Sequence, residues 1–400
     1  MNLAEHIYSN IYAFTDVDTP VRFGIINIAG NANITISNAT FNQVFTGASN
    51  VIIGFINNNL WVPQDNVLQF FHVDNVYSTL KDNPFGSKLG GILCLAPPGS
   101  TRYYQYIIKD SVLNERNNDA NFLIAILGQF IEDYTISNMT ISNSQIPRIG
   151  CGLYSLRNLT IDGLSYTSIT NQGEFIFFAI SRVATLNNIT MNGIDIQISQ
   201  SKLFRFTGIG TVIHLSNILI KNWDLSSSSA IQFDGTLSQI VISHVTSDSL
   251  ITDTDGAVFN IEFVTILQTS SLAFTNISSS TLDSSNNYMI MIDVMDLSAA
   301  YPSTMQNVTV SNWSTGIIKI QSLSGNLTQG NMLAIQDVMV SDYNVSNSIN
   351  LISLTTLTTY DLYPIIFSSM TFRNLEFMQG GNILTLNTLL VPRFKSSTVY

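Results

Sequence analysis

The sequence predicts an all-β fold, a solenoid of roughly twelve stacked coils, and three observations support this prediction. First, a short pattern returns along the 400 residues, as NITISNATF at 33–41, YTISNM at 134–139 and VTVSNW at 308–313. Second, apolar and polar residues alternate in each copy, which is the period of a β-strand with one buried face. Third, each copy ends in Asn, Gly, Asp or His, the residues most tolerant of left-handed backbone.

The residues that end the copies are expected to be corners, where a strand bends and the next one begins. Apolar or aromatic residues stand four and two positions before each corner, as Ile34 and Ile36 do before Asn38. Stacked Asn corners would also hydrogen-bond along a ladder, as amides do in stacked strands. The expected corners are Asn38, Asn75, Asp110, Asn138, Gly163, Gly193, Asn222, His244, Asn276, Asn312, Asp342 and Asn374.

A second strand-like run follows in each repeat, for example AIQFDG at 230–235 and AVFNIEF at 257–263. One such coil cannot bury its inner face alone, so neighbouring coils must stack on it. A leucine-rich repeat is the alternative fold. There the Asn falls three residues after the last apolar strand residue, whereas here it falls two after. The second half of each repeat is also strand-like rather than helical.

The expected domain organisation has one main body. Residues 1–24 are predicted to be an N-terminal cap or lead-in, residues 25–390 the parallel β-helix, and residues 391–400 a C-terminal tail. Loop insertions are expected near 81–104, where prolines and glycines interrupt the pattern. No linker long enough to separate independent domains is visible.

Composition excludes several classes of protein. About 45% of residues are hydrophobic and 11% charged, which favours a large core over disorder. The formal charge of −11 and the lack of a basic run argue against nucleic acid as a partner. The longest mainly apolar segment, 121–131, is shorter than the ~20 residues of a membrane span. The N-terminus lacks the features of a signal peptide. Cys94 and Cys151 are expected to be buried thiols, and a disulfide between them stays open.

Three acidic residues end neighbouring strand-like runs and form the main candidate site. If the coils stack in register, Asp234, Glu262 and Asp293 point outward in one column, with Arg205 and Lys319 in the adjoining column. Such carboxylates can raise each other's pKa, bind Ca²⁺ through oxygen ligands, or supply an acid and a base for glycoside cleavage. The alternative is that they are solvated residues that keep exposed strands from associating.

N-x-Ser/Thr sequons are frequent and would suit a secreted glycoprotein. Most of them fall either at a corner or five residues before one, so the repeat itself also generates them. The candidate glycosylation sites are Asn33, Asn38, Asn138, Asn158, Asn188, Asn276, Asn307, Asn312, Asn326 and Asn344.

Through its apolar pairs and its corner asparagines, among them Asn38, Asn138 and Asn276, the chain resembles a right-handed parallel β-helix of the pectin-lyase-like superfamily. The resemblance covers roughly residues 25–390. The Asn/Ser/Ile-rich style also resembles β-helix segments in large surface proteins of unicellular eukaryotes. Enzymes of the superfamily place their chemistry on an outer sheet face, as the acidic column would be. The superfamily's hydrolase signatures NTD, DD, GHG and RIK are absent, and Arg205 is the candidate base for a lyase.

The sequence therefore favours a non-catalytic structural or adhesive rod, a segment of a larger protein at a cell surface or outside the cell. Glycans or other surface proteins are the expected partners. One alternative is a polysaccharide lyase, a glycoside hydrolase or a Ca²⁺-dependent glycan-binding protein that uses the acidic column. Another alternative is a trimeric protein like a tail fibre.

Overall fold

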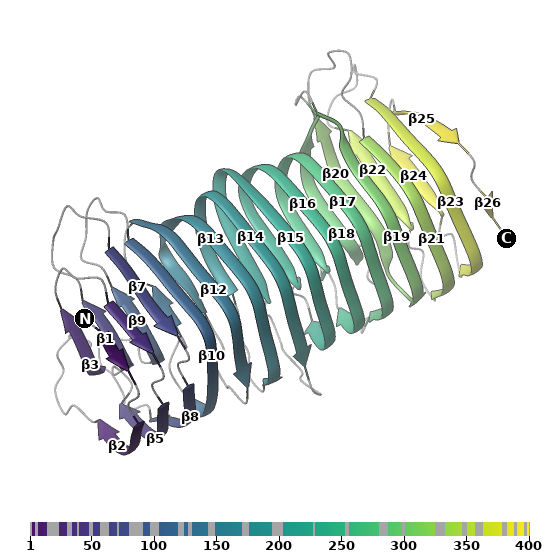
Figure 1. Ribbon diagram of the computed structural model, residues 1–400. Coiled ribbons are helices and arrows are strands. Elements are labelled where there is room, and N and C mark those ends of the chain that lie inside the picture. Colours follow the sequence, from purple (N-terminus) through teal and green to yellow (C-terminus); the bar gives the residue numbers. More distant parts are fainter. Residues whose placement is uncertain are drawn as a thin grey trace. The chain divides into compact units, whose positions relative to one another are not determined.

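A computed structural model shows a parallel β-solenoid, and every pairing between its described strands is parallel (Figure 1). This confirms the predicted all-β parallel β-helix. The chain divides into two compact units, residues 1–196 and 197–400, which are treated separately below. The expectation of one continuous solenoid over 25–390 therefore stays a prediction. Among the described residues no helix is long and apolar enough to cross a membrane.

The first unit contains fourteen described strands: β1 Asn2–Ala4, β2 Ile7–Ala13, β3 Gly24–Ala29, β4 Ile34–Ser37, β5 Thr40–Gly47, β6 Val51–Ile56, β7 Gln64–Gln69, β8 His72–Thr79, β9 Gly91–Ala96, β10 Tyr104–Asn118, β11 Ile124–Ile126, β12 Phe130–Ser142, β13 Ile149–Ile169 and β14 Ile176–Gly193. The second contains twelve: β15 Phe204–Ser226, β16 Ile231–Thr252, β17 Phe259–Ser279, β18 Tyr288–Asp296, β19 Ser303–Trp313, β20 Gly316–Ser324, β21 Leu333–Val345, β22 Ile352–Thr356, β23 Tyr363–Phe377, β24 Leu384–Asn387, β25 Leu390–Lys395 and β26 Thr398–Val399.

The structure describes the backbone of these strands and of residues 203, 229–230, 256–258, 287, 297, 301–302, 314–315, 350–351 and 382–383. Side chains are described for residues 133–142, 156–166, 180, 182–193, 203–225, 229–252, 256–278, 287–297, 301–324, 333–342, 350–355, 365–376 and 382–386.

The second unit makes six successive coils, because one column of paired residues runs through it without a break. The column consists of Phe204, Ile231, Phe259, Ile290, Ile318, Ile352 and Leu384. All of these except Leu384 are buried inside the coil. Each fully buried side chain of this kind contributes about 1.5–3 kcal/mol relative to an exposed one. Coil-to-coil stacking of apolar columns thus forms the core, as the repeat requires.

Each coil of the second unit bends at two columns of left-handed residues, which lie five positions apart. The first column is Asn217, His244, Ser271, Asn307, Asp337 and Ser369, and the second is Asn222, Ser249, Asn276, Asn312, Asp342 and Asn374, all with φ between 47° and 57°. At each bend two consecutive side chains lie outside the core, as Ser243 and His244 do, and the inward–outward alternation then restarts.

The single series of corners expected from the sequence therefore mixes two columns. In the second unit His244 belongs to the first column, whereas Asn222 and Asn276 belong to the second. Both bends follow the same apolar–polar pattern at an offset of five residues, so the pattern alone does not separate them.

The first unit shows the same division. Strand pairing stacks Gly163 on Asn138 and Asn188 on Gly163, and all three have positive φ. Gly193 instead lies opposite Ile169 at the end of β14, so it is not in this column. Asp110 stands opposite Asn138, since the residues on either side of it pair with Ser137 and Met139.

Two of the remaining expected corners are less completely described. Asn75 follows Asp74, which pairs with Asn114, so it falls in a different column from Asp110. Asn38 lies outside the described residues.

Asparagine side chains near these bends hydrogen-bond from coil to coil. Asn276 Nδ2 donates to Asp248 Oδ1 at 2.8 Å, and Asn312 Nδ2 donates to Asn276 Oδ1 at 2.6 Å. Asn374 Nδ2 likewise donates to Asp342 Oδ1 at 3.0 Å. In each case the donor belongs to the later coil and the acceptor to the earlier one. The bends are thus joined along the stacking direction by side chains as well as by backbone.

The backbone register also bears on the two cysteines. Cys94 of β9 pairs with Ala125 of β11, whereas Cys151 of β13 pairs with the next residue, Ile126. The two cysteines are therefore two coils apart, about 9.6 Å at the strand spacing of the backbone. A disulfide requires Cα atoms within about 7 Å. The register thus excludes a bond between them in this fold.

Removing an unpaired hydroxyl from the core is expected to stabilise the second unit. Thr269 is 2% exposed, and its Oγ1 has no hydrogen-bond partner in the structure. A buried polar group without a partner costs about 1–3 kcal/mol. We expect Thr269→Val, which keeps the shape, to raise the free energy of unfolding by about 1 kcal/mol. Urea denaturation monitored by tryptophan fluorescence would measure this change in the free energy of unfolding.

A buried threonine with a partner provides the control. Thr252 donates its hydroxyl to Asn287 Oδ1 at 3.0 Å, and both residues are buried. Thr252→Val is expected to lower the free energy of unfolding by about 1–2 kcal/mol, since Asn287 loses this donor. Equal effects of the two substitutions would contradict the assignment of Thr269.

Candidate functional site

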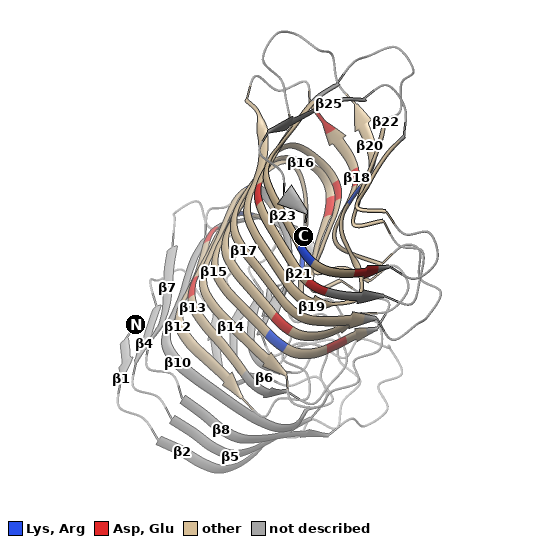
Figure 2. Cartoon of the chain, turned by 90° about the vertical axis from the view of Figure 1, so that its right-hand side faces the viewer, with Lys and Arg blue, Asp and Glu red and all other residues tan. Residues whose placement is uncertain are grey.

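The candidate site lies on the outer face of the sheet formed by the first straight segment of each coil in the second unit. One outward column consists of Arg205, Gln232, Asn260, Met291, Lys319 and Ser353. In the adjoining column the register brings Asp234, Glu262 and Asp293 to three consecutive coils, and Gln321 follows them. The positions of Asp and Glu along the ribbons are marked in red in Figure 2.

A β-bulge shifts Asp234 relative to Glu262. Phe233 pairs with Ile261 and Thr236 pairs with Phe263, so two residues of β16 stand opposite one residue of β17. The second of these residues is Gly235, whose φ is +85°. Bulges of this kind locally disrupt the ladder and redirect side chains.

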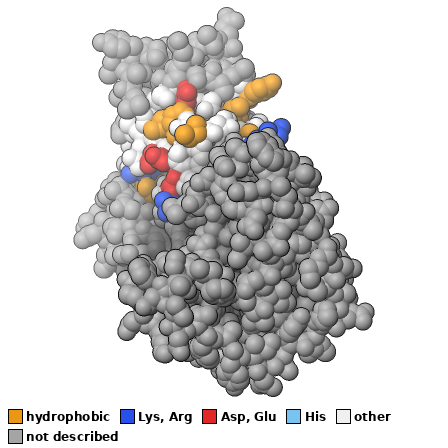
Figure 3. Space-filling view, turned by 90° about the vertical axis from the view of Figure 1, so that its left-hand side faces the viewer, with side chains coloured by type: hydrophobic (Ala, Val, Ile, Leu, Met, Phe, Trp, Pro, Cys, Tyr) orange, Lys and Arg blue, Asp and Glu red, His pale blue; other side chains and the backbone are white. Residues whose placement is uncertain are grey.

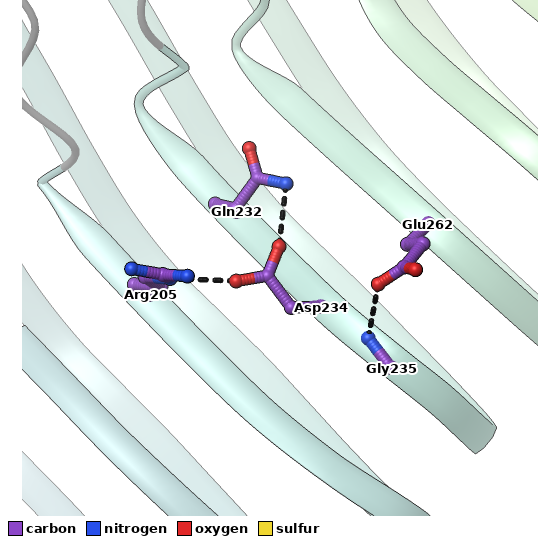
Figure 4. A network of polar contacts seen from close by, with 5 residues as sticks. All are labelled: Arg205, Gln232, Asp234, Gly235 and Glu262. Atoms are coloured by element: carbon purple, nitrogen blue, oxygen red, sulfur yellow. Dashed lines mark hydrogen bonds and ion pairs between the residues drawn. The ribbon is translucent and has the colours of Figure 1, made fainter.

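Asp234 is held by two donors of its own chain (Figure 4). Arg205 Nε donates to Asp234 Oδ2 at 2.6 Å, and Gln232 Nε2 donates to Asp234 Oδ1 at 2.8 Å. The Arg205 and Asp234 side chains are 34% and 22% exposed, so solvent screens the ion pair. Both carboxylate oxygens are thus engaged before any ligand arrives.

Glu262 is exposed, and it accepts a hydrogen bond from the backbone of the bulge (Figure 4). The Gly235 N–H donates to Glu262 Oε2 at 2.5 Å. A backbone donor freed by the bulge would otherwise depend on water. The carboxylate of β17 therefore also has a structural role, because it caps the bulge of β16.

Asp293 accepts a hydrogen bond from Gln321 Nε2 at 2.9 Å, across one coil boundary. Burial raises the pKa of its carboxyl, the neighbouring Glu262 carboxylate raises it further, and Lys319 lowers it. Two like charges on successive coils disfavour double ionisation. Glu262 and Asp293 therefore form a pair of carboxyl groups in unequal environments.

We expect Asp293→Asn to stabilise the protein more at pH 7 than at pH 4. A carboxyl whose pKa is raised in the folded state binds its proton more tightly there. The stability that this tighter proton binding gives the folded state is fully present below the ordinary pKa of 3.8. It is lost as the pH rises through the folded-state pKa. Asparagine stays neutral and still accepts from Gln321. Urea denaturation of both proteins between pH 4 and 7 would measure it, and a pH-independent difference would contradict it.

An aromatic side chain that the sequence analysis did not single out lies on the same face. Tyr288 packs with Ala257 and Met291, and Lys319 Nζ lies 5.6 Å from the centroid of its ring. Burial raises the pKa of Tyr288, and a hydrogen bond with Ser353 opposes that effect. Because Met291 contacts this cluster, it is only 5% exposed although it faces outward. The feature of the sequence that accompanies this cluster is Gly316, whose missing side chain leaves room for the Tyr288 ring.

The site lacks a metal-binding arrangement as far as it is described. Among the described residues no group of three or more His, Cys, Asp and Glu side chains is placed to hold a metal ion. Asp234 instead accepts from Arg205 and Gln232. What the column offers chemically is the pair Glu262 and Asp293, with one carboxyl exposed and the other half-buried.

Most of the sequons with described side chains belong to the bends. Asn138, Asn188, Asn276, Asn307 and Asn312 are exposed residues with positive φ. Asn158 is half-buried and donates to Asp133 Oδ1 at 2.8 Å, and Asn188 donates to Asp162 Oδ1 at 2.8 Å. The side chains of Asn33, Asn38, Asn326 and Asn344 lie outside the described residues.

Comparison with known proteins adds no family to this description. No protein-family model matches the sequence, and no curated protein matches it. The fold class and the geometry of the outer face are therefore the basis for any statement about function.

Proposed function

We propose that this chain is a non-catalytic structural or adhesive β-solenoid, part of a larger protein displayed at a cell surface. The observation that supports it is that several outer polar side chains in the described coils are hydrogen-bonded to one another. Asp234 accepts from Arg205 and Gln232, Glu262 caps a bulge, and Asn276 and Asn312 extend a ladder. Such bonds join neighbouring coils and strengthen their stacking.

The coil is further proposed to be the right-handed type of the pectin-lyase-like superfamily, without that superfamily's catalysis. Among the described side chains, Glu262 and Asp293 form the pair that most resembles a catalytic arrangement. A second candidate function is therefore a polysaccharide-active enzyme, in which Asp293 protonates the leaving oxygen and Glu262 acts as base or nucleophile. The raised pKa of Asp293 is the observation that favours it.

The experiment that separates the two functions measures the chain length of polysaccharides by size-exclusion chromatography. The protein would be incubated with acidic and neutral polysaccharides, with and without Ca²⁺. Unchanged chain lengths across the panel are expected. Shortening that disappears in Glu262→Gln and Asp293→Asn would overturn the structural role and assign an active site to this pair.

The proposed location at the cell surface is tested separately, on the cells that make the protein. Antibodies raised against residues 203–386 are expected to label intact cells without permeabilisation. Labelling that appears only after permeabilisation would contradict a surface role.

A further inference from the structure

A mainly apolar column, interrupted by Thr236, runs beside the carboxylates of the outer face. Pairing brings Ile209, Thr236, Phe263 and Val294 together on four consecutive coils. Ile209 is 82% exposed, and Phe263 and Val294 are half-buried. We call Ile209, Phe263 and Val294 the apolar ridge. Figure 3 shows apolar side chains gathered next to acidic ones on the described part of one face.

The exposure of Ile209 follows from the backbone around it. It lies between Gly208 and Gly210, and Gly210 has a φ of +68°. A large aliphatic side chain in this position gains nothing from the core. Exposed apolar side chains next to charged ones are found at sites that bind another molecule.

The charge beside the ridge is acidic. Glu262 and Asp293 occupy successive coils, about 4.8 Å apart along the stacking direction. Their repulsion is one cause of the raised pKa of Asp293. The whole chain carries a formal charge of −11. Lys319 already offsets part of this repulsion, and a cationic group of a partner placed between the two carboxylates would relieve it further.

A buried polar atom lies at one end of the ridge. Ser322 pairs with Val294 and so continues the same column. It is 7% exposed, and its hydroxyl has no hydrogen-bond partner in the structure. Because the hydroxyl oxygen itself is buried, Ser322 marks the end of the exposed column and not a contact for an occupant.

We propose that the apolar ridge and the Glu262–Asp293 pair form a docking surface for an extended segment of another protein, in which Lys or Arg alternates with apolar residues. Successive side chains of an extended strand point to opposite sides. Such a segment can therefore direct its cations to the carboxylate column and its apolar side chains to the ridge. Four coils span about 14 Å, the length of four or five extended residues.

Other occupants fit less well. The ridge carries two aliphatic side chains and one ring rather than a row of exposed aromatics on which sugar rings stack. Carboxylates beside it would repel an anionic membrane surface. The inference rests on the proposed adhesive function, and it names the chemistry of the partner for that function.

The test uses the whole chain and a fluorescently labelled hexapeptide of alternating Lys and Leu, with both ends blocked. Fluorescence anisotropy is expected to show saturable binding that weakens as salt increases, because exposed charges are screened. Peptides with Glu in place of Lys, or with Ser in place of Leu, are expected not to bind.

Two variants, each with a matched control, locate the binding. Ile209→Ser is expected to raise the Kd about tenfold by removing apolar contact. Glu262→Gln is expected to raise it about threefold, while the amide still accepts from Gly235. Met339→Ser and Glu376→Gln alter exposed residues of the same kinds outside the ridge and the carboxylate column, and they should leave the Kd unchanged.

Three outcomes would overturn the docking surface: no peptide binds, the Lys–Ser peptide binds as well as the Lys–Leu peptide, or Ile209→Ser has no effect. The polysaccharide assay distinguishes this failure from failure of the proposed function. Unchanged polysaccharides together with no peptide binding would remove only the docking surface. Shortened polysaccharides would remove the structural role itself.

Discussion

Gly235→Ala is expected to lower the free energy of unfolding of the second unit by about 3 kcal/mol. Gly235 has a φ of +85°, and a non-glycine residue in left-handed backbone costs roughly 1–2 kcal/mol. A Cβ atom there would also stand 2.5 Å from the carbonyl oxygen of Gly208 on the neighbouring coil. That atom is backbone, so it cannot rotate away, and the bulge capped by Glu262 must shift. Urea denaturation in a Trp61→Phe background would report this through Trp223 and Trp313, both buried in the second unit.

Gly210→Ala separates the two causes. Gly210 also has positive φ, +68°, but a Cβ there would meet only Ser238 Oγ, at 3.8 Å. Its cost is expected to be the conformational term alone, about 1 kcal/mol. If Gly235→Ala costs no more than Gly210→Ala, the close approach of Gly208 has no energetic consequence.

Gly316→Ala is expected to cost about 2–3 kcal/mol through overpacking rather than through backbone strain. A Cβ at Gly316 would overlap the ring of Tyr288. The ring cannot move aside freely, because Ala257, Met291 and Lys319 contact it. The same fluorescence-detected denaturation measures the loss.

A double-mutant cycle with Tyr288 tests the mechanism. Tyr288→Ala alone is expected to destabilise by about 3–5 kcal/mol, since a buried aromatic side chain is lost. When Tyr288→Ala is also present, Gly316→Ala should cost less than 1 kcal/mol, because the new Cβ atom no longer overlaps a tyrosine ring. A coupling energy near zero would show that Gly316 acts through something other than the ring.

The fold could be predicted from the sequence because its signal is periodic. Alternating apolar residues and left-handed-tolerant residues recur in every coil, and both are local consequences of the backbone. The identity of the corner columns was less accessible. Serines such as Ser249 and Ser271 adopt the same conformation as Asn276, although a corner pattern based on Asn, Gly, Asp and His does not include them. The stacking register, which depends on pairing between coils, was needed to separate the two columns.

The arrangement of side chains on the outer face could likewise be predicted only in part from the sequence. The alternation within each strand predicted that Asp234, Glu262 and Asp293 face outward, and the pairing brings Glu262 and Asp293 opposite each other. It did not indicate the bulge at Gly235, which arises from an extra residue relative to the next coil. Nor did it indicate the contact of Tyr288 with Lys319, because such neighbours are set by the distance between coils rather than by sequence spacing.

The direction of the asparagine bonds has a consequence for how the protein is made. Asn276 donates to Asp248, Asn312 to Asn276, and Asn374 to Asp342, so each later residue donates to one that left the ribosome before it. A coil emerging during translation finds its acceptors already in place on the coil before it. At these three bends, the asparagine donor does not have to wait for a later coil. Within the second unit, the stacking of these coils can therefore follow the order of their synthesis.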